Sequence, residues 1–354
     1  MIRIATYNVE WFDALFDDAG KPLLENTASR RHKVTCFEQL TALSHVFKSL
    51  DADAIMVIEA PDTSRKRDTV QALEQFADFA GLRANTVVTG MTNDTRQEIA
   101  LLYDPLILRA RHDPKGAMMD QGQLVTDAAI SPRFDQEFLP MQAVDLQKPV
   151  RFSKPPLEVQ VQVRDTGVSF RMIGVHVKSK APHGARDHED FVRISIENRR
   201  KQAAQCLWLR ARVDEHLSAN DPLIVLGDFN DGPGLDAYEK LFGRSGLEIV
   251  IGDSQTAQKD AQARCLFDPH AKMAMAHRPR ATPTTSRFFI SHENRYLSAL
   301  LDYVMLSSDL KPHGTWRIWH PFDDPFCYHD TALREALLTA SDHFPVTVDL
   351  ELPS

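Results

Sequence analysis

The stretch 222–230, which reads P-L-I-V-L-G-D-F-N, decides the fold class. Its run of apolar residues predicts a short strand buried on both faces, as strands are in layered α/β folds. Asp228 and Asn230 follow at once, and both would be costly to bury without partners. Strand ends and the loops beyond them are the usual place for a functional site in such folds. This stretch therefore predicts a layered architecture with a site at the strand ends.

The same pattern recurs outward from this stretch in both directions. Predicted strands cover residues 2–9, 52–60, 98–104, 157–163, 170–177, 222–228, 299–306 and 344–352. Predicted helices cover residues 31–50, 69–80 and 198–217. In the first helix the apolar residues recur every three or four positions, which is the spacing of one helix face. Strands that alternate with helices favour layered α/β packing, and nothing in the sequence marks a domain boundary.

Polar residues stand at or near the ends of several predicted strands. They are Asn8, Glu59, His176, Asp228, Asn230, Asp302, Asp342 and His343. Taken singly, an Asp or Asn is usually a turn residue or a helix cap, and a His is usually a hydrogen-bonded core residue. Taken together, they are the groups that metal-assisted phosphate chemistry needs. A divalent cation screens the phosphate charge, a carboxylate activates water, and a histidine held by a carboxylate assists proton transfer.

Short motifs around these residues resemble those of the endonuclease/exonuclease/phosphatase superfamily. In chain order they are T-Y-N-V (6–9), V-I-E-A (57–60), G-D-F-N (227–230), L-D-Y-V (301–304) and S-D-H-F-P-V (341–346). The superfamily includes pancreatic-type deoxyribonucleases, abasic-site endonucleases, sphingomyelinases and inositol polyphosphate 5-phosphatases. The resemblance implies a four-layer α/β sandwich, with two facing mixed β-sheets and helices on the outside.

The resemblance also implies roles for the motif residues. Glu59 resembles the main ligand of a Mg²⁺ or Mn²⁺ ion, with Asn8 and Asp342 nearby. Asp228 resembles the group that activates water, and Asn230 stands beside it.

Two motif histidines take further roles from the resemblance. His343 resembles a phosphate-facing histidine, with Asp302 as its carboxylate partner. Glu98, in R-Q-E-I-A-L-L-Y, and His176, in G-V-H-V-K-S-K, resemble a glutamate–histidine pair of the deoxyribonuclease-like branch.

The residues after His176 are basic. H-V-K-S-K (176–180) resembles a motif of bacterial nuclease-like members, which implies that Lys178 contacts phosphate, and we predict the same role for Lys180. The range 171–201 holds eight Lys and Arg against four Asp and Glu, and 264–295 holds six against two. The formal net charge of the whole chain is −8, which does not suggest a bulk nucleic-acid binder. A local basic surface on an acidic protein is what recognition of an anionic substrate would require.

We expect one domain over 1–354, with inserts near 109–154, 181–193, 254–295 and 315–339 that select the substrate. No apolar run approaches the roughly 20 residues of a membrane span. The first strand starts at Ile2, so nothing here resembles a signal peptide, and we expect a cytoplasmic location. The four cysteines are scattered, which argues against a zinc site or a disulfide framework.

Three functional hypotheses remain open at this point. The leading one is a metal-dependent nuclease that hydrolyses phosphodiester bonds by direct attack of water. The second is a phosphoesterase for a small phosphorylated metabolite or a lipid headgroup, although we expect no exposed aromatic hairpin of the kind that inserts into membranes. The third is a non-catalytic binding module, which the complete set of site residues argues against. The sequence does not indicate DNA or RNA, endo or exo action, the number of metal ions or the oligomeric state.

Overall fold

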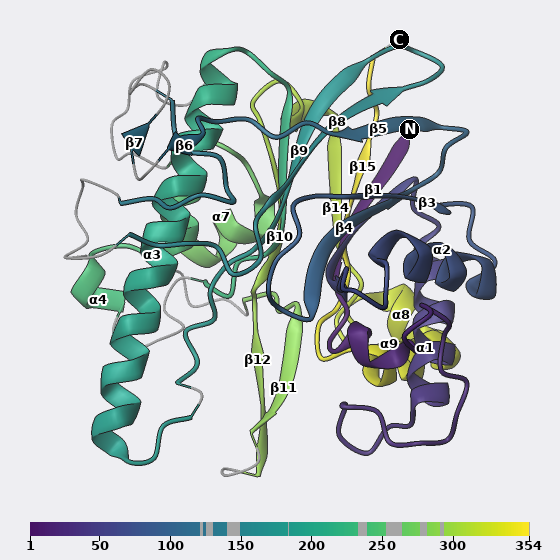
Figure 1. Ribbon diagram of the computed structural model, residues 1–354. Helices are drawn as coiled ribbons and strands as arrows, with labels where there is room; N and C mark the ends of the chain where they lie inside the picture. Colours follow the sequence, from purple (N-terminus) through teal and green to yellow (C-terminus); the bar gives the residue numbers. More distant parts are fainter. Residues whose placement is uncertain are drawn as a thin grey trace.

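The computed structural model describes residues 1–120, 123–124, 130–139, 149–182, 184–232, 239–252, 264–276, 282–290 and 294–353. Within these residues the chain forms two facing β-sheets, each covered by helices on its outer side (Figure 1). The predicted four-layer α/β sandwich is therefore confirmed.

Both large sheets of the described residues are mixed. The first has the strand order β14 (Gly314–Ile318), β15 (Val346–Leu350), β1 (Ile2–Asn8), β2 (Ala54–Pro61), β4 (Gln97–Tyr103) and β3 (Thr86–Thr89). The second has the order β13 (Asp302–Leu306), β10 (Leu223–Asp228), β9 (Ser169–His176), β8 (Leu157–Val163) and β5 (Leu108–His112). β1 pairs in parallel with β2, and β10 pairs in parallel with β9. Each parallel pair brings two carboxyl strand ends to one edge of its sheet.

Helices cover the outer face of each sheet. The helices on the first sheet are α1 (Cys36–Leu50), α2 (Thr69–Ala80), α8 (Pro325–His329) and α9 (Thr331–Ala340). On the side of the second sheet lie α3 (His188–Ser218), α4 (Glu239–Phe242), α5 (Gly246–Ile251) and α7 (Pro269–Met275) (Figure 1). Short 3₁₀ helices are η1 (Phe12–Leu15) and η2 (Lys311–His313). Two small hairpins complete the described elements, β6 (Met119–Asp120) with β7 (Gln123–Leu124) and β11 (Ser286–Ile290) with β12 (Arg295–Ala299). No helix among the described residues combines the length and the apolar character needed to cross a membrane.

Three apolar clusters fill the spaces between the four layers. In β1, Ile2 and Ile4 point into the cluster between the two sheets, whereas Ala5 and Tyr7 point towards the helices of the first sheet. Successive side chains of a strand alternate between faces, so a strand that is covered on both faces must be apolar at almost every position. The third cluster lies between the second sheet and α3, and Trp208 is fully buried in it.

Local capping sets where two helices begin. α1 starts at Cys36, later than the predicted residue 31, because Thr35 and Glu38 form a capping box. α3 starts at His188, earlier than the predicted residue 198, and the Asp187 side chain accepts the backbone N–H of Asp190. None of the apolar residues in its first ten positions is buried, so core packing does not require a regular apolar pattern there.

The predicted insert 315–339 differs from the structure. The range 315–339 holds most of β14 together with α8 and α9, and α9 packs on the first sheet through Leu333 and Leu337. β14 is an edge strand that is only half buried, so its apolar signal is weak. The hairpin β11–β12 carries two exposed aromatic side chains, Phe289 and Tyr296, which the sequence pattern did not indicate. Neither β11 nor β12 alternates cleanly between polar and apolar residues, so periodicity does not reveal either strand.

Candidate active site

The carboxyl ends of four strands, two from each sheet, meet in one cluster. Asn8 at the end of β1 donates from Nδ2 to Oδ2 of Asp228 at the end of β10, over 3.0 Å. His176 ends β9, and its Nε2 lies 3.6 Å from the same oxygen of Asp228. Glu59, near the end of β2, has Oε1 4.0 Å from His176 Nε2. The sheets thus bring together residues that are far apart in the sequence.

Glu59 reaches this cluster because of a β-bulge. Ile58 pairs with Ile99, but Ala60 pairs with Glu98, so Glu59 is the extra residue on its strand. Its φ of 66° lies in the left-handed region, which is rare for a residue with a side chain. A bulge reorients a side chain, and here the Glu59 carboxylate accepts hydrogen bonds from the Trp11 backbone N–H and the Gln97 amide. Backbone strain of this kind typically accumulates at functional sites.

Asp228 is buried among hydrogen-bond donors. Its Oδ2 accepts from Asn8 and from Nδ2 of Asn230, at 3.0 and 3.1 Å, and its Oδ1 accepts the Asn230 backbone N–H at 2.7 Å. Burial raises the pKa of Asp228 to about 7, with a further rise from the charge of Asp302, while the positive charge of His343 opposes this. Asn230 also donates to the carbonyl of Val177 over 3.0 Å, which fixes the loop after β10.

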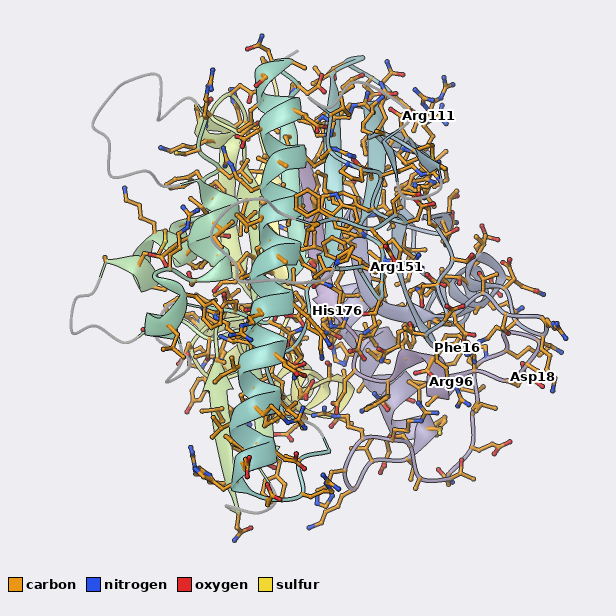
Figure 2. The ribbon with its side chains drawn as sticks, turned by 60° about the vertical axis from the view of Figure 1, so that its left-hand side comes forward. Phe16, Asp18, Arg96, Arg111, Arg151 and His176 are labelled. Carbon is orange, nitrogen blue, oxygen red and sulfur yellow. The ribbon has the colours of Figure 1, made fainter. Side chains whose placement is uncertain are left out.

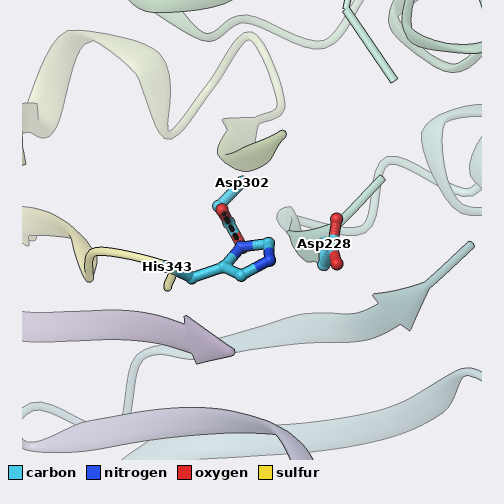
Figure 3. Close-up of side chains that lie close together, drawn as sticks. All are labelled: Asp228, Asp302 and His343. Atoms are coloured by element: carbon cyan, nitrogen blue, oxygen red, sulfur yellow. Dashed lines mark hydrogen bonds and ion pairs between the residues drawn. The ribbon is translucent and has the colours of Figure 1, made fainter. Parts of the chain in front are cut away.

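Asp302 and His343 form a buried pair beside Asp228 (Figure 3). Asp302 Oδ2 lies 2.7 Å from His343 Nδ1 and also accepts a hydrogen bond from the Thr285 hydroxyl at 2.8 Å. Burial lowers the pKa of His343, but the carboxylates of Asp302, Asp228 and Asp342 outweigh it and raise that pKa well above its ordinary value. His343 is therefore favoured in its charged form, with Nδ1–H donating to Asp302.

The remaining carboxylates give the cluster the character of a cation site. Burial raises the pKa of Asp342 to about 7, the charge of His343 lowers it, and the charges of Glu10 and Glu59 raise it again. Oδ1 of Asn8 is buried and accepts no hydrogen bond from the described residues. Hard divalent cations such as Mg²⁺ prefer carboxylate and amide oxygens, and they relieve repulsion between carboxylates. The residues present therefore fit a divalent metal ion.

Lys154, which the sequence analysis did not single out, contacts two residues of the cluster. Its Nζ lies 3.1 Å from His176 Nδ1 and 3.9 Å from Glu59 Oε1. An ammonium can only donate, so His176 Nδ1 accepts and the proton of the neutral ring is on Nε2. Burial lowers the pKa of His176 well below its ordinary value, and the charges of Lys154, His343 and Lys178 lower it further. His176 is thus a neutral donor that faces Asp228.

The structure does not bring the predicted pair of Glu98 and His176 together. Glu98 lies on the side of β4 that faces the helices, with Ala100 and Leu102, and its carboxylate accepts from the Asn93 amide over 2.8 Å. Gln97 lies on the opposite face and contacts Glu59 instead. Strand alternation therefore places Gln97, not its neighbour Glu98, beside the cluster.

The two predicted phosphate-binding lysines have different surroundings. Burial lowers the pKa of Lys178, whose charge in turn lowers the pKa of His176. The ammonium of Lys180 donates to the buried carboxylate of Asp231 over 2.6 Å, and Asp231 also pairs with Arg199. Lys180, in the loop after β9, is thus held by an ion pair with Asp231 in the loop after β10.

Two further residues that the sequence analysis did not select hold the cluster in place. The Ser341 hydroxyl donates to the Asn8 carbonyl over 2.8 Å and accepts the His343 backbone N–H at 3.1 Å. The Thr285 hydroxyl accepts the backbone N–H of Asp302 at 3.0 Å. Ser341 stands in the S-D-H motif, so its motif was a usable signal, whereas Thr285 lies in a predicted insert and had none.

Comparison with known proteins shows the family of this chain. The sequence profile described as the Endonuclease/Exonuclease/phosphatase family matches residues 5–343. No curated protein sequence matches the chain. Similar solved structures include the human Nocturnin catalytic domain with bound sulfate, at 13% identity and a TM-score of 0.46, covering 99% of this chain and 94% of that one. TDP2 from Caenorhabditis elegans is 12% identical with a TM-score of 0.49, covering 98% and 73%. An AP endonuclease from Archaeoglobus fulgidus is 12% identical with a TM-score of 0.45, covering 99% and 100%. Because the family profile spans nearly the whole chain, the protein belongs to the endonuclease/exonuclease/phosphatase family.

Proposed function

We propose that this protein is a divalent-metal-dependent phosphodiesterase that cleaves nucleic acid by attack of water. The observation that carries the proposal is the meeting of Asp228 with the Asp302–His343 pair beside Glu59 and Asn8. The family consists of hydrolases that act on phosphate esters, which agrees with this set of groups.

Glu59, Asn8 and Asp342 would hold the metal ion, because they offer oxygen ligands. Asp228, Asp302 and His343 also offer ligand atoms within 4.8 Å of one another. We assign these three residues to proton transfer rather than to metal binding, because His343 Nδ1 already forms a hydrogen bond with Asp302. When bound, Mg²⁺ or Mn²⁺ would screen the phosphate charge and stabilise the leaving oxygen.

Asp228 takes the proton of the attacking water. The water oxygen forms a bond to phosphorus while the bond from phosphorus to the leaving ester oxygen breaks. Asn8 and Asn230 hold the Asp228 carboxylate in one orientation through their amide groups. Asp302 orients the charged imidazole of His343, whose Nε2–H would donate to a non-bridging phosphate oxygen. His176 offers a second, neutral donor at Nε2.

The basic stretch after His176 favours nucleic acid over a small phosphate ester. Lys178 is half-buried beside the cluster, and its charge influences His176. A nucleic acid carries further phosphates beside the reacting one, and the Lys178 ammonium would bind one of them.

The test is a hydrolysis panel with Mg²⁺, Mn²⁺ or EDTA. It would contain single- and double-stranded DNA, RNA, nucleotides, inositol phosphates and phospholipids. We expect cleavage of a nucleic acid, and Asp228→Asn and His343→Ala should each lower its rate about 100-fold or more. Asp165→Asn and His329→Ala are matched controls on exposed residues and should leave the rate unchanged. Cleavage of the small esters or lipids alone would replace the nuclease assignment with the second hypothesis.

A further inference from the structure

The hairpin β11–β12 is anchored directly to the candidate active site. Ser286 forms a β-bridge with His343, and the Arg287 backbone N–H donates to the Asp342 carbonyl over 2.7 Å. From this anchor the hairpin projects beyond the end of β10 (Figure 1). Groups on the hairpin are therefore placed to meet the part of a substrate that extends from the reacting phosphate.

The hairpin carries exposed aromatic rings around one cation. Phe289 is 39% exposed and Tyr296 is 52% exposed, with their ring centroids 5.2 Å apart. The Arg287 guanidinium lies 3.9 Å over the Tyr296 ring and 5.6 Å from the ring of Phe322. The imidazole of His32, from the loop before α1, stacks on Phe289 with 5.7 Å between centroids. None of the described carboxylates pairs with the Arg287 guanidinium.

This combination has the chemistry of a nucleotide subsite. A guanidinium that stacks on a ring keeps its edge N–H groups for a phosphate, to which it can bind through two hydrogen bonds. An exposed ring offers a surface on which a base stacks, whatever its sequence. Such stacking needs a base that is not already paired and stacked, so it selects single strands. The hairpin connection 291–294 reads S-H-E-N, whose polar residues do not suit insertion into a lipid bilayer.

We propose that β11–β12 binds the nucleotide next to the scissile phosphate of a single-stranded nucleic acid. Phe289 and Tyr296 stack with its base, and Arg287 binds its phosphate. This inference rests on the proposed function, because it assumes that the reacting phosphate lies at the Asp228–His343 cluster. It goes further by assigning the strandedness of the substrate and the residues that set it.

Binding would be measured by fluorescence anisotropy with a labelled single-stranded oligonucleotide and Mn²⁺, in an Asp228→Asn background that should cleave about 100-fold more slowly. Phe289→Ala/Tyr296→Ala should weaken binding about tenfold to 100-fold. Phe289→Trp/Tyr296→Trp should restore it, because the rings are retained. Phe79→Ala is the matched control, since Phe79 lies on α2 with the same 39% exposure, and it should change nothing.

An abasic oligonucleotide separates stacking from other effects of the substitutions. The background protein should bind it as weakly as the double alanine variant binds the normal strand, and the variant should lose no further affinity. The base-stacking assignment would be overturned if the double alanine substitution lowered the affinity for the abasic and the normal strand equally. It would also be overturned if the double alanine variant bound the normal strand as tightly as the background protein does.

Arg287→Ala tests the phosphate contact through salt dependence. The slope of log Kd against log salt concentration should fall by about 0.7, the amount expected for one phosphate contact on a single strand. Arg111→Ala is the matched control, because Arg111 is 66% exposed in its side chain and lies on β5, the edge strand of the second sheet opposite β13 (Figure 2). An unchanged slope for Arg287→Ala would remove the phosphate assignment.

The remaining outcomes distinguish this inference from the proposed function. If the hairpin variants cleave and bind single strands like the unsubstituted protein, the subsite is wrong while the nuclease assignment stands. If the unsubstituted protein neither binds nor cleaves any nucleic acid, both fail. If the double alanine variant instead loses sedimentation with phosphatidylserine vesicles and keeps its oligonucleotide binding, the hairpin contacts membranes and the inference is overturned.

Discussion

At the scale of single residues, Lys154 lies between two groups of the candidate active site. Its ammonium contacts the imidazole of His176 and the carboxylate of Glu59. Only 14% of its side chain is exposed, and burial lowers its pKa. The Glu59 charge counteracts that effect and keeps the ammonium available as a donor to His176. Lys154 is therefore a positioning residue for the histidine ring.

Lys154→Ala should lower kcat about tenfold to 100-fold, because His176 loses the partner that fixes its proton on Nε2. KM should change little, and Lys154→Arg should restore part of the rate. Nitrogen NMR of His176 would report the tautomer directly. Lys66→Ala, at a position with 73% side-chain exposure, is the control. A Lys154→Ala protein with full kcat and an unaltered tautomer would contradict the role.

The buried carboxyl group of Glu98 leads to a separate prediction about stability. Burial raises its pKa from 4.5 to about 7, so the folded protein holds this proton while the unfolded chain releases it. Its contribution to the free energy of unfolding is present below about pH 4.5 and is lost as the pH rises through 7. The free energy of unfolding of Glu98→Gln, relative to that of the unsubstituted protein, should therefore rise by about 1–3 kcal/mol between pH 4.5 and pH 8. Urea denaturation across this pH range is the measurement. If the difference in unfolding free energy between the two proteins does not change with pH, the raised pKa of Glu98 is contradicted.

The sequence predicted which motif residues would meet, but not every neighbour. Asn8, Asp228 and His343 stand at strand ends in recognisable motifs, so their meeting followed from the fold. Glu98 was predicted from the resemblance of its motif, which does not show that Gln97, on the opposite face of β4, lies beside the cluster. Lys154 has no motif, since an isolated lysine before a strand looks like any other surface charge.

At the scale of elements, a buried ion pair joins α3 to the second sheet. Arg212 of α3 donates to Glu158 of β8 over 2.7 Å, and both side chains are buried. Arg212 also donates to the carbonyls of Ser131 and Pro132. The pair thus ties a long helix to a strand and to the segment 130–139, and the sequence could not reveal it because these residues are distant along the chain.

Arg212→Met should cost about 3–5 kcal/mol of unfolding free energy, because it leaves Glu158 buried without its cation. Replacing both residues, as in Arg212→Met/Glu158→Leu, should cost less than the sum of the single changes. Thermal or urea denaturation of the full double-mutant cycle measures this coupling. Additive effects would show that the two side chains stabilise the fold independently.

At the scale of the whole molecule, the two sheets must approach closely for their strand ends to form one site. Gly174 of β9 faces Met56 of β2 across the interface, and a Cβ added at Gly174 would lie 2.8 Å from Met56 Cγ. Met56 is fully buried, so it has little room to move. The absence of a side chain at Gly174 therefore sets the spacing of the sheets at this point.

Gly174→Ala should destabilise the protein by about 1–3 kcal/mol, because it overpacks the core between the sheets. Met56→Val in the same chain should recover part of this loss by making room. Urea denaturation would measure both effects. If Met56→Val destabilises the Gly174→Ala protein as much as it destabilises the unsubstituted protein, the two residues do not compete for the same space.

The central claim, that this cluster is a metal-dependent phosphodiesterase site, is tested most directly by the rate of oligonucleotide cleavage against Mg²⁺ or Mn²⁺ concentration. The protein should be inactive in EDTA and should reach a saturating rate as metal is added. Glu59→Gln should need about tenfold to 100-fold more metal for half the maximal rate. Full activity in EDTA, or a Glu59→Gln curve that coincides with that of the unsubstituted protein, would contradict the claim.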